Sequence, residues 1–194
     1  MAKSWGGKKR NRKSPANVPA ADGVIQIFTD GACEPNPGAG GWGYCIPEMR
    51  IERSGGARRT TNNQMEMMAA VVALEELAIL GRPVIIWTDS RYLQNGITSW
   101  IVGWMKRGWM TSAGTPVLNK DLWLRLKAAV DRCEGHGGAV HFNWVKGHSG
   151  HRHNERADRL AAQGRADALG IPTPVPTDRP YFGRVIQREN IPQG

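Results

Sequence analysis

The sequence has few cysteines and no long apolar run. Its 194 residues include only three cysteines, Cys33, Cys45 and Cys133, an odd number that are far apart. They do not form the disulfide framework of a small secreted protein, so we expect a reducing, cytoplasmic location. No stretch approaches the roughly 20 apolar residues that span a bilayer, and no apolar signal-peptide segment follows the first basic residues. These absences exclude a transmembrane protein and predict no membrane partner.

Acidic residues are also scarce relative to basic ones. The chain has 17 Asp and Glu against 26 Lys and Arg, a formal net charge of +9. Residues 1–22 hold six basic residues and one acidic residue, so this short segment supplies +5 of the total. A basic chain of this kind favours a polyanionic partner, nucleic acid before membrane. Because residues 1–22 cannot form a core, we expect a disordered basic arm, whose role is either solubility or nucleic-acid contact.

The length predicts one domain with a tail at each end. We place the domain at residues 23–168. The remaining residues, 169–194, include IPTPVPTDRP, whose alternating prolines prevent a helix and favour an extended path. The sequence has no internal repeat and no obvious interface stripe, so we expect a monomer without an obligate protein partner.

Alternating and continuous apolar patterns predict an α/β domain. Strands are expected at residues 24–29, 41–46, 51–57, 84–88 and 140–145, and helices at 64–80, 90–95, 100–106, 121–133 and 154–168. The Gly- and Pro-rich segment after the first strand, GACEPNPGAGGWG, is predicted as a loop. The first three strands are expected to form an antiparallel meander, and VIIWT at 84–88 is typical of a buried parallel strand. The predicted fold is a five-stranded mixed sheet flanked by helices.

Four carboxylates are predicted to converge at one edge of this sheet. Asp30 and Asp89 each directly follow an apolar strand, and a helical crossover makes those strands parallel. Glu66 lies in the first turns of the crossover helix, and Asp158 is expected to open the last helix. Each residue alone is more simply explained as a turn or helix-end residue. Together their repulsion requires a hard divalent cation, and two such ions would suit phosphoryl transfer.

Four segments of the sequence resemble the successive motifs of bacterial ribonuclease HI. They are IFTDGACEPNPGAGGWG, TTNNQMEMMAAVVALEEL, IIWTDSRYLQNGITSWIVGWMKRGWMT and VKGHSGHRHNERADRLA, in family order over about residues 24–165. The resemblance implies the ribonuclease H fold and endonucleolytic hydrolysis of the RNA strand of an RNA–DNA hybrid. It further implies a two-metal-ion mechanism that uses Mg²⁺, with Mn²⁺ able to substitute, and that leaves 5′-phosphate and 3′-hydroxyl ends.

By the same resemblance, the metal ligands are four carboxylates, namely Asp30, Glu66, Asp89 and Asp158. Asp30 and Asp158 would hold the ion that activates the attacking water, with Asp30 bridging both ions. The mobile catalytic histidine falls on His148, in a loop whose glycines permit movement. A zinc site formed by His148, His151 and His153 is an alternative, although it lacks a fourth ligand at suitable spacing.

The resemblance also implies a set of hybrid-binding residues, namely Cys33, Asn36, Thr61, Asn62, Asn63, Arg91, Trp100, Lys106 and Arg107. Trp100 is expected to face the DNA sugar and Trp104 to pack, whereas Asn62 and Asn63 are also candidates for capping the helix that they precede. The chain departs from the family in Gln64 and Arg91, where arginine and glutamine are common, and in a segment near residue 110 that has few lysines. Fine substrate preference is therefore open.

Two rival functions share the fold. A noncatalytic hybrid-binding module would keep the surface but not need the acids, and all four acids and His148 are present. An integrase-like strand-transfer domain fits the long motifs poorly. A metal-dependent ribonuclease is the predicted function.

Overall fold

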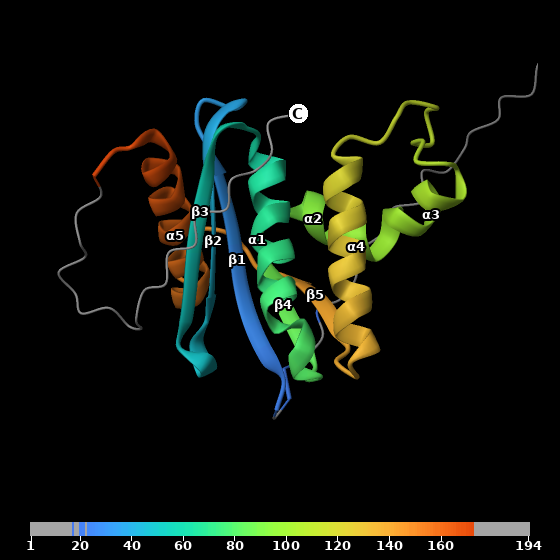
Figure 1. Ribbon diagram of the computed structural model, residues 1–194, viewed down its shortest axis with the longest axis horizontal. Helices are drawn as coiled ribbons and strands as arrows, with labels where there is room; N and C mark the ends of the chain where they lie inside the picture. Colours follow the sequence, from blue (N-terminus) through green and yellow to red (C-terminus); the bar gives the residue numbers. More distant parts are fainter. Residues whose placement is uncertain (1–16, 18–19, 22, 173–194) are drawn as a thin grey trace, which may run out of the picture.

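A computed structural model describes residues 17, 20–21 and 23–172 of the chain. The predicted arm at 1–22 and the predicted tail at 169–194 lie mostly outside the described residues. The described residues form a five-stranded sheet of order β3-β2-β1-β4-β5, with helices on both faces (Figure 1). The strands are β1 (Ile25–Cys33), β2 (Gly38–Ile46), β3 (Ile51–Thr60), β4 (Val84–Thr88) and β5 (Val140–Trp144).

The sheet is mixed, as predicted. Strands β1, β2 and β3 pair antiparallel, whereas β1, β4 and β5 pair parallel. The predicted loop after the first strand is wrong in its extent, because β1 continues to Cys33 and β2 begins at Gly38. The glycines of β2 allow close packing against a helix instead of forming a turn. A Cβ on Gly41 would lie 2.2 Å from the main-chain oxygen of Ala161, so this position of β2 lets the last helix lie directly against the sheet.

The helices cover the two faces unequally. They are α1 (Asn62–Leu77), α2 (Arg91–Asn95), the π-helical turn η3 (Gly96–Trp100), α3 (Ile101–Lys106), α4 (Lys120–Gly135) and α5 (Arg152–Leu169), with single 3₁₀ turns η1 (Pro47–Met49) and η2 (Ala78–Leu80). Helix α1 packs on β1 with α4 beside it, and α5 covers β1, β2 and β3 from the other face (Figure 1). The two helices predicted within 90–106 are joined by η3. No helix in the described part of the chain is long and apolar enough to cross a bilayer.

Helix α1 is buried on all sides from Met65 to Leu74, which explains its nearly uniform apolar sequence. Its N-terminus is capped by Thr61, whose side chain accepts from the Gln64 main-chain N–H while the Gln64 side chain accepts from the Thr61 N–H. The capping role considered for Asn62 and Asn63 is therefore wrong, because Thr61 is the cap and they are the first two helical residues. This cap fixes the start of the helix and directs its fifth residue, Glu66, into the interior.

Helix α5 begins earlier than predicted. His151 caps it, with its Nδ1 accepting from the Asn154 main-chain N–H, and the helix starts at Arg152. Asp158 is therefore the seventh helical residue and lies in the second turn instead of opening the helix. The difference arises because an imidazole acts as the cap, in a position where Ser, Thr, Asp or Asn is the usual signal.

Candidate active site

Three carboxylates meet where the parallel part of the sheet ends. The last β1–β4 pair is Thr29 with Thr88, and the next residues on the two strands are Asp30 and Asp89. Glu66 enters from the first turns of α1. Carboxylate oxygens of Asp30, Glu66 and Asp89 all lie within 4.8 Å of one another. The predicted convergence at this sheet edge is therefore observed for these three residues.

Burial and mutual repulsion disfavour the charged form of these acids. Asp30 is 6% exposed and Glu66 is 4% exposed. Burial, followed by the charges of Asp89 and Asp158, raises the pKa of Asp30 to about 8, although the Gly31 main-chain N–H donates to Asp30 Oδ1 at 2.7 Å and partly opposes the shift. Burial and the charges of Asp30 and Asp89 likewise raise the pKa of Glu66 well above its usual value. Protons and cations therefore compete for Asp30 near neutral pH.

The fourth predicted acid lies farther out. Asp158 is half-buried in the second turn of α5 and is not one of the three residues whose oxygens lie within 4.8 Å of one another. Its charge nevertheless raises the pKa values of Asp30, Glu66 and Asp89. The structure thus places three acids in a tight group and Asp158 within electrostatic reach of all three.

The donor set fits divalent cations. Glu66 Oε1 accepts from Asn62 Nδ2 at 3.4 Å, whereas Glu66 Oε2 is buried and has no hydrogen-bond partner among the described residues. An unpaired carboxylate oxygen in the interior is destabilising by several kcal/mol unless a cation or donor compensates it. Hard divalent ions prefer a set of carboxylate oxygens such as this one. The site therefore has both the charge and the unsatisfied ligand atom that such an ion requires.

Two residues that sequence reasoning missed hold Asp89 in place. Asn154 is 2% exposed, and its side chain hydrogen-bonds to Asp89, which opposes the rise in the pKa of that carboxyl. Trp144 Nε1 donates to the Asp89 main-chain oxygen at 3.0 Å. The sequence does contain a signal for Asn154, because it lies four residues before Asp158 and therefore on the same helical face. No local signal identifies Trp144.

The loop from β5 to α5 carries His148 past the acids. A Cβ on Gly147 would lie 2.3 Å from Asp89 Oδ2, so only glycine lets the loop pass this close to the carboxylate. His148 is exposed, has a φ of 48°, and its charge lowers the pKa of Asp89. The alternative zinc site is not formed. Among the described residues the only close group of three His, Cys, Asp or Glu ligand atoms is the acidic one, and the His151 and His153 rings pack against Phe28.

Comparison with known proteins identifies the family. Residues 22–166 match the ribonuclease H family. Ribonuclease H from Maricaulis maris is 53% identical over 149 residues, which cover 76% of this chain and 97% of that protein. Ribonuclease H from Alcanivorax borkumensis is 52% identical over 142 residues, 72% of this chain and 90% of that protein. The chain belongs to the ribonuclease H family. It is thus an endonuclease of the hydrolase class, and membership carries ribonuclease activity on RNA–DNA hybrids and metal dependence.

Solved structures show the same fold. LC9-RNase H1, a type 1 RNase H with the type 2 active-site motif, is 27% identical, with a TM-score of 0.60 over 79% of this chain and 76% of that one. A foamy viral protease-reverse transcriptase in complex with dsDNA matches with a TM-score of 0.65 at 19% identity, over 78% of this chain and 99% of that one. At that identity the second likeness concerns the fold alone.

Several predicted hybrid-binding residues of this ribonuclease H family member lie beside Glu66. Asn36, in the loop between β1 and β2, accepts through Oδ1 from the Asn62 main-chain N–H at 3.2 Å, which joins that loop to the start of α1. Thr61 is the helix cap, Asn63 is exposed, and Cys33 Sγ donates to the Pro35 main-chain oxygen at 3.2 Å. Asn62 also donates to Glu66 Oε1, so this group of residues is joined to the acidic cluster through Asn62.

The remaining predicted contacts lie on α2, η3 and the end of α3. The Arg91 guanidinium stacks 3.6 Å from the centroid of the Trp144 ring, close to Asp89. Trp100 is 37% exposed, whereas Trp104 is 9% exposed, which confirms that Trp104 packs. Lys106 and Arg107 are exposed at the end of α3.

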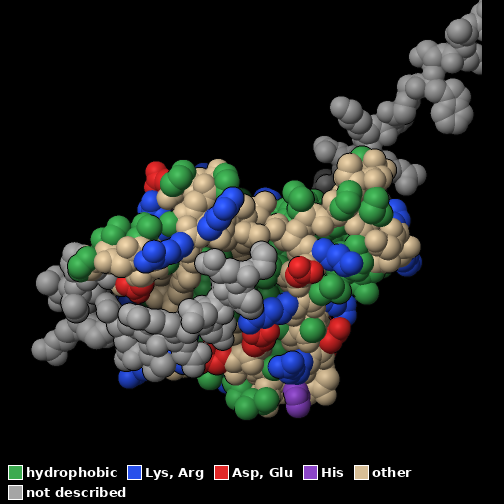
Figure 2. Space-filling view, turned by 45° about the horizontal axis from the view of Figure 1, so that its top comes forward, with side chains coloured by type: hydrophobic (Ala, Val, Ile, Leu, Met, Phe, Trp, Pro, Cys, Tyr) green, Lys and Arg blue, Asp and Glu red, His purple; other side chains and the backbone are tan. Residues whose placement is uncertain are grey.

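The surface around α3 carries three exposed apolar side chains. Val102, Met105 and Leu118 are 59%, 47% and 77% exposed, respectively. The space-filling view shows hydrophobic side chains beside Lys and Arg in this part of the molecule (Figure 2). These apolar side chains offer no charge to a phosphate backbone, so the cations at the end of α3 are Lys106 and Arg107.

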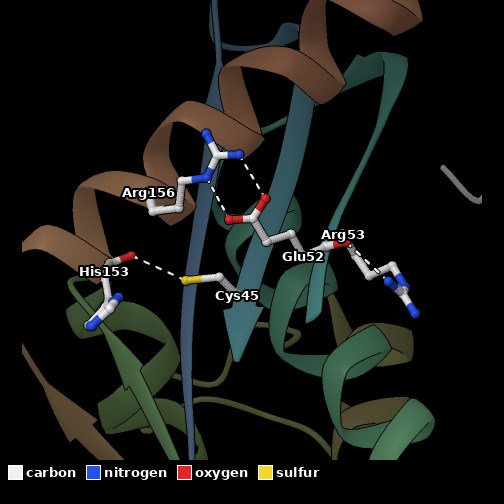
Figure 3. A network of polar contacts seen from close by, with 5 residues as sticks. All are labelled: Cys45, Glu52, Arg53, His153 and Arg156. Atoms are coloured by element: carbon white, nitrogen blue, oxygen red, sulfur yellow. Dashed lines mark hydrogen bonds and ion pairs between the residues drawn. The ribbon is translucent and has the colours of Figure 1, made fainter. Parts of the chain in front are cut away.

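A buried ion pair attaches α5 to the antiparallel part of the sheet (Figure 3). Glu52 on β3 accepts two bonds of 2.7 Å from Nε and one NH2 nitrogen of Arg156, and Cys45 Sγ on β2 donates to the His153 main-chain oxygen at 3.5 Å. Burial raises the pKa of the Cys45 thiol to about 12, so it remains neutral. These contacts bracket the turn of α5 that carries Asn154 and precedes Asp158.

Breaking this pair is expected to destabilise the fold. The Glu52 side chain is 5% exposed, so Glu52→Ala removes both bonds from a half-buried guanidinium, and we expect a loss of about 2–3 kcal/mol in the free energy of unfolding. Unfolding in urea measures this loss in the free energy of unfolding. The control is Lys127→Ala, which removes an exposed pair with Asp131 and is expected to change stability by about 0.5 kcal/mol or less. Equal effects of the two variants would contradict a structural role for the Glu52–Arg156 pair.

Proposed function

We propose that the protein hydrolyses the RNA strand of RNA–DNA hybrids with two divalent ions, Mg²⁺ in the first instance, leaving 5′-phosphate and 3′-hydroxyl ends. Residues 23–168 form the catalytic unit in this proposal. The observation that carries it is the cluster of Asp30, Glu66 and Asp89 with its unpartnered buried oxygen, at the sheet edge where Asp158 also acts.

Each acid has a distinct part in this proposal. Asp30 faces the other three acids and would bridge the two ions, sharing one with Asp158 and the other with Glu66 and Asp89. When bound, such ions lower the pKa of a coordinated water and neutralise charge on the attacking and leaving oxygens. The protein's contribution is to hold four carboxylates at fixed positions, Glu66 through the capped helix and Asp89 through Asn154 and Trp144.

His148 is proposed to move a proton. Its imidazole is exposed, the neighbouring Gly147 passes the Asp89 carboxylate, and the charge of His148 acts on Asp89, which supports a role beside the acidic cluster. An imidazole can accept or donate a proton at a ring nitrogen. We infer that it assists departure of the product or transfer of the proton from the attacking water.

Discrimination of RNA from DNA is assigned to the side chains beside Glu66. Reading RNA requires groups that donate to or accept from the 2′-hydroxyl. Asn36, Asn62 and the main chain near Cys33 would supply such groups on the RNA side, and the Thr61 hydroxyl would contact a DNA-strand phosphate; the bond from the Asn62 N–H to Asn36 Oδ1 supports this, because it joins two of these residues next to the start of α1. Arg91, Trp100, Lys106 and Arg107 would contact the DNA strand across α2 and α3.

A cleavage assay tests the proposal. A labelled RNA–DNA hybrid, an RNA duplex and a DNA duplex are each incubated with the protein and Mg²⁺, with and without EDTA. We expect cleavage of the RNA strand in the hybrid alone, abolition by EDTA, and products with 5′-phosphate ends. A noncatalytic binding module would bind the hybrid in a mobility-shift assay without cutting it, which would overturn the proposal.

The raised pKa values predict a pH-dependent metal requirement. Protons compete with cations for Asp30, whose pKa is about 8, and for Glu66, so less metal should bind as the pH falls below 8. We expect the Mg²⁺ concentration for half-maximal cleavage to rise by about tenfold or more between pH 8.5 and pH 6.5. Measuring Mg²⁺ titrations at both pH values tests this. An unchanged midpoint would show that the acids do not carry competing protons.

A further inference from the structure

An asparagine upstream of the family domain covers the open edge of the sheet. Strand β5 lies at one edge of the sheet. The main-chain N–H and oxygen of its last residue, Trp144, point away from β4. Asn17 Nδ2 donates to the Trp144 oxygen at 2.7 Å, and the Trp144 N–H donates to Asn17 Oδ1 at 2.7 Å. The Asn17 carboxamide therefore bonds both main-chain groups of Trp144, as a neighbouring strand would. These two bonds hold residue 17 at the end of β5.

A second anchor holds the chain at the opposite end of the sheet. Arg82, just before β4, donates through Nε and NH2 to the Gly23 main-chain oxygen at 3.2 and 2.9 Å. Ile25 then enters β1, donating to the Pro83 oxygen at 2.8 Å. Because Trp144 pairs with Thr88 at the carboxyl end of the parallel strands, Asn17 lies at the active-site end. Whatever precedes residue 17 therefore starts there.

The anchoring residue also belongs to the scaffold of the active site. Trp144 binds the Asp89 main chain through Nε1 and carries the Arg91 guanidinium on its ring. Asn17 therefore contacts Trp144, which in turn contacts Asp89, a candidate metal ligand. A group tethered to Asn17 is consequently tethered near Asp89 and near the exposed Arg91 guanidinium.

The sixteen residues before this anchor carry six basic side chains and no acidic one, namely Lys3, Lys8, Lys9, Arg10, Arg12 and Lys13. A chain extends by at most about 3.6 Å per residue, so the Cα atom of Lys13 stays within about 14 Å of that of Asn17, and the Cα atom of Arg10 within about 25 Å. The family match begins at residue 22, so these charges are additional to the shared domain.

We propose that residues 1–16 form an additional nucleic-acid contact, which Asn17 holds beside the active site so that its cations bind phosphates of the hybrid. This inference rests on the proposed function. Lysines and arginines without acidic neighbours suit the sequence-independent phosphate backbone. Anchoring raises the effective concentration of those charges at the bound duplex. The arm thereby adds cations beside a surface around α3 that carries exposed apolar residues.

Hybrid binding across a salt series tests the proposal, with the full chain in an inactive Asp30→Asn background. The first variant is Arg10→Gln, Arg12→Gln and Lys13→Gln combined. We expect it to weaken binding at low salt and to reduce the slope of log affinity against log salt by about 2–3, since each phosphate contact contributes about 0.9. The matched control neutralises Arg179, Arg184 and Arg188 near the other end of the chain and is expected to leave the slope unchanged.

The anchor is tested by a double-mutant cycle. Asn17→Ala keeps every charge, and we expect it to weaken binding by about threefold or more in the basic chain but to have no effect once the three charges are neutralised. An equal effect in both backgrounds would assign Asn17 to strand-edge stability alone and overturn the proposal. Equal slopes for both charge variants, or tighter binding after neutralisation of the arm, would overturn it as well.

The outcomes separate this inference from the proposed function. If the parent protein neither binds nor cleaves the hybrid, the proposed function fails. If the parent cleaves the hybrid and all of these variants bind it with equal affinity and salt dependence, only the role of the arm fails.

Discussion

Asp30→Asn is expected to reduce hybrid cleavage by about 10³-fold or more while the protein remains folded. The carboxylate faces the three other acids, and an amide provides neither the charge nor the two anionic oxygens that a shared pair of cations requires. Single-turnover cleavage with saturating Mg²⁺ measures the loss. Asp131→Asn, an exposed acid on α4, is the matched control and should cleave like the parent. Activity within tenfold of the parent would refute the assignment of Asp30.

The same substitution is expected to stabilise the metal-free protein. Because the pKa of Asp30 is raised to about 8, folding takes up a proton there. The associated stability is complete below about pH 4 and is lost as the pH rises through about 8. Asparagine does not titrate, so at pH 7 the variant should be more stable by about 2 kcal/mol, or about 4–8 °C in Tm. Thermal unfolding in EDTA at pH 4 and pH 7 checks this. A stability gain as large at pH 4 as at pH 7 would point to packing instead.

His148→Ala is expected to lower kcat by about 10²-fold with little change in KM, which is the size typical of a general acid–base group. The side chain is exposed, so its removal should not affect stability. Steady-state kinetics on the hybrid measures both constants. His141→Ala, an exposed histidine on β5, is the control and should leave kcat unchanged. A rise in KM with kcat retained would make His148 a binding residue instead.

Local sequence patterns determined most of the fold. The pattern of apolar residues along an element predicts which of its faces are buried. This holds for the uniform apolar run of β4, the buried stretch of α1 and the amphipathic spacing of α4. The acids Asp30 and Asp89 were readable for the same reason, since residues directly after parallel strands meet at one edge. The family and its reaction were predicted from the resemblance of the four sequence motifs, and not from local patterns.

Only the tertiary structure decided how these acids are supported. The Glu52–Arg156 pair joins residues 104 apart, and Asn17 binds Trp144 across 127 residues. No local pattern encodes such partners, because each side chain alone is equally suited to solvent. The ends of β1 and β2 could not be predicted either, because glycine is compatible both with a turn and with a closely packed strand. The close packing of α5 against the β2 glycines shows that they belong to a strand. Sequence thus determined which chemical groups reach the site, whereas long-range packing decided their burial and therefore their charge.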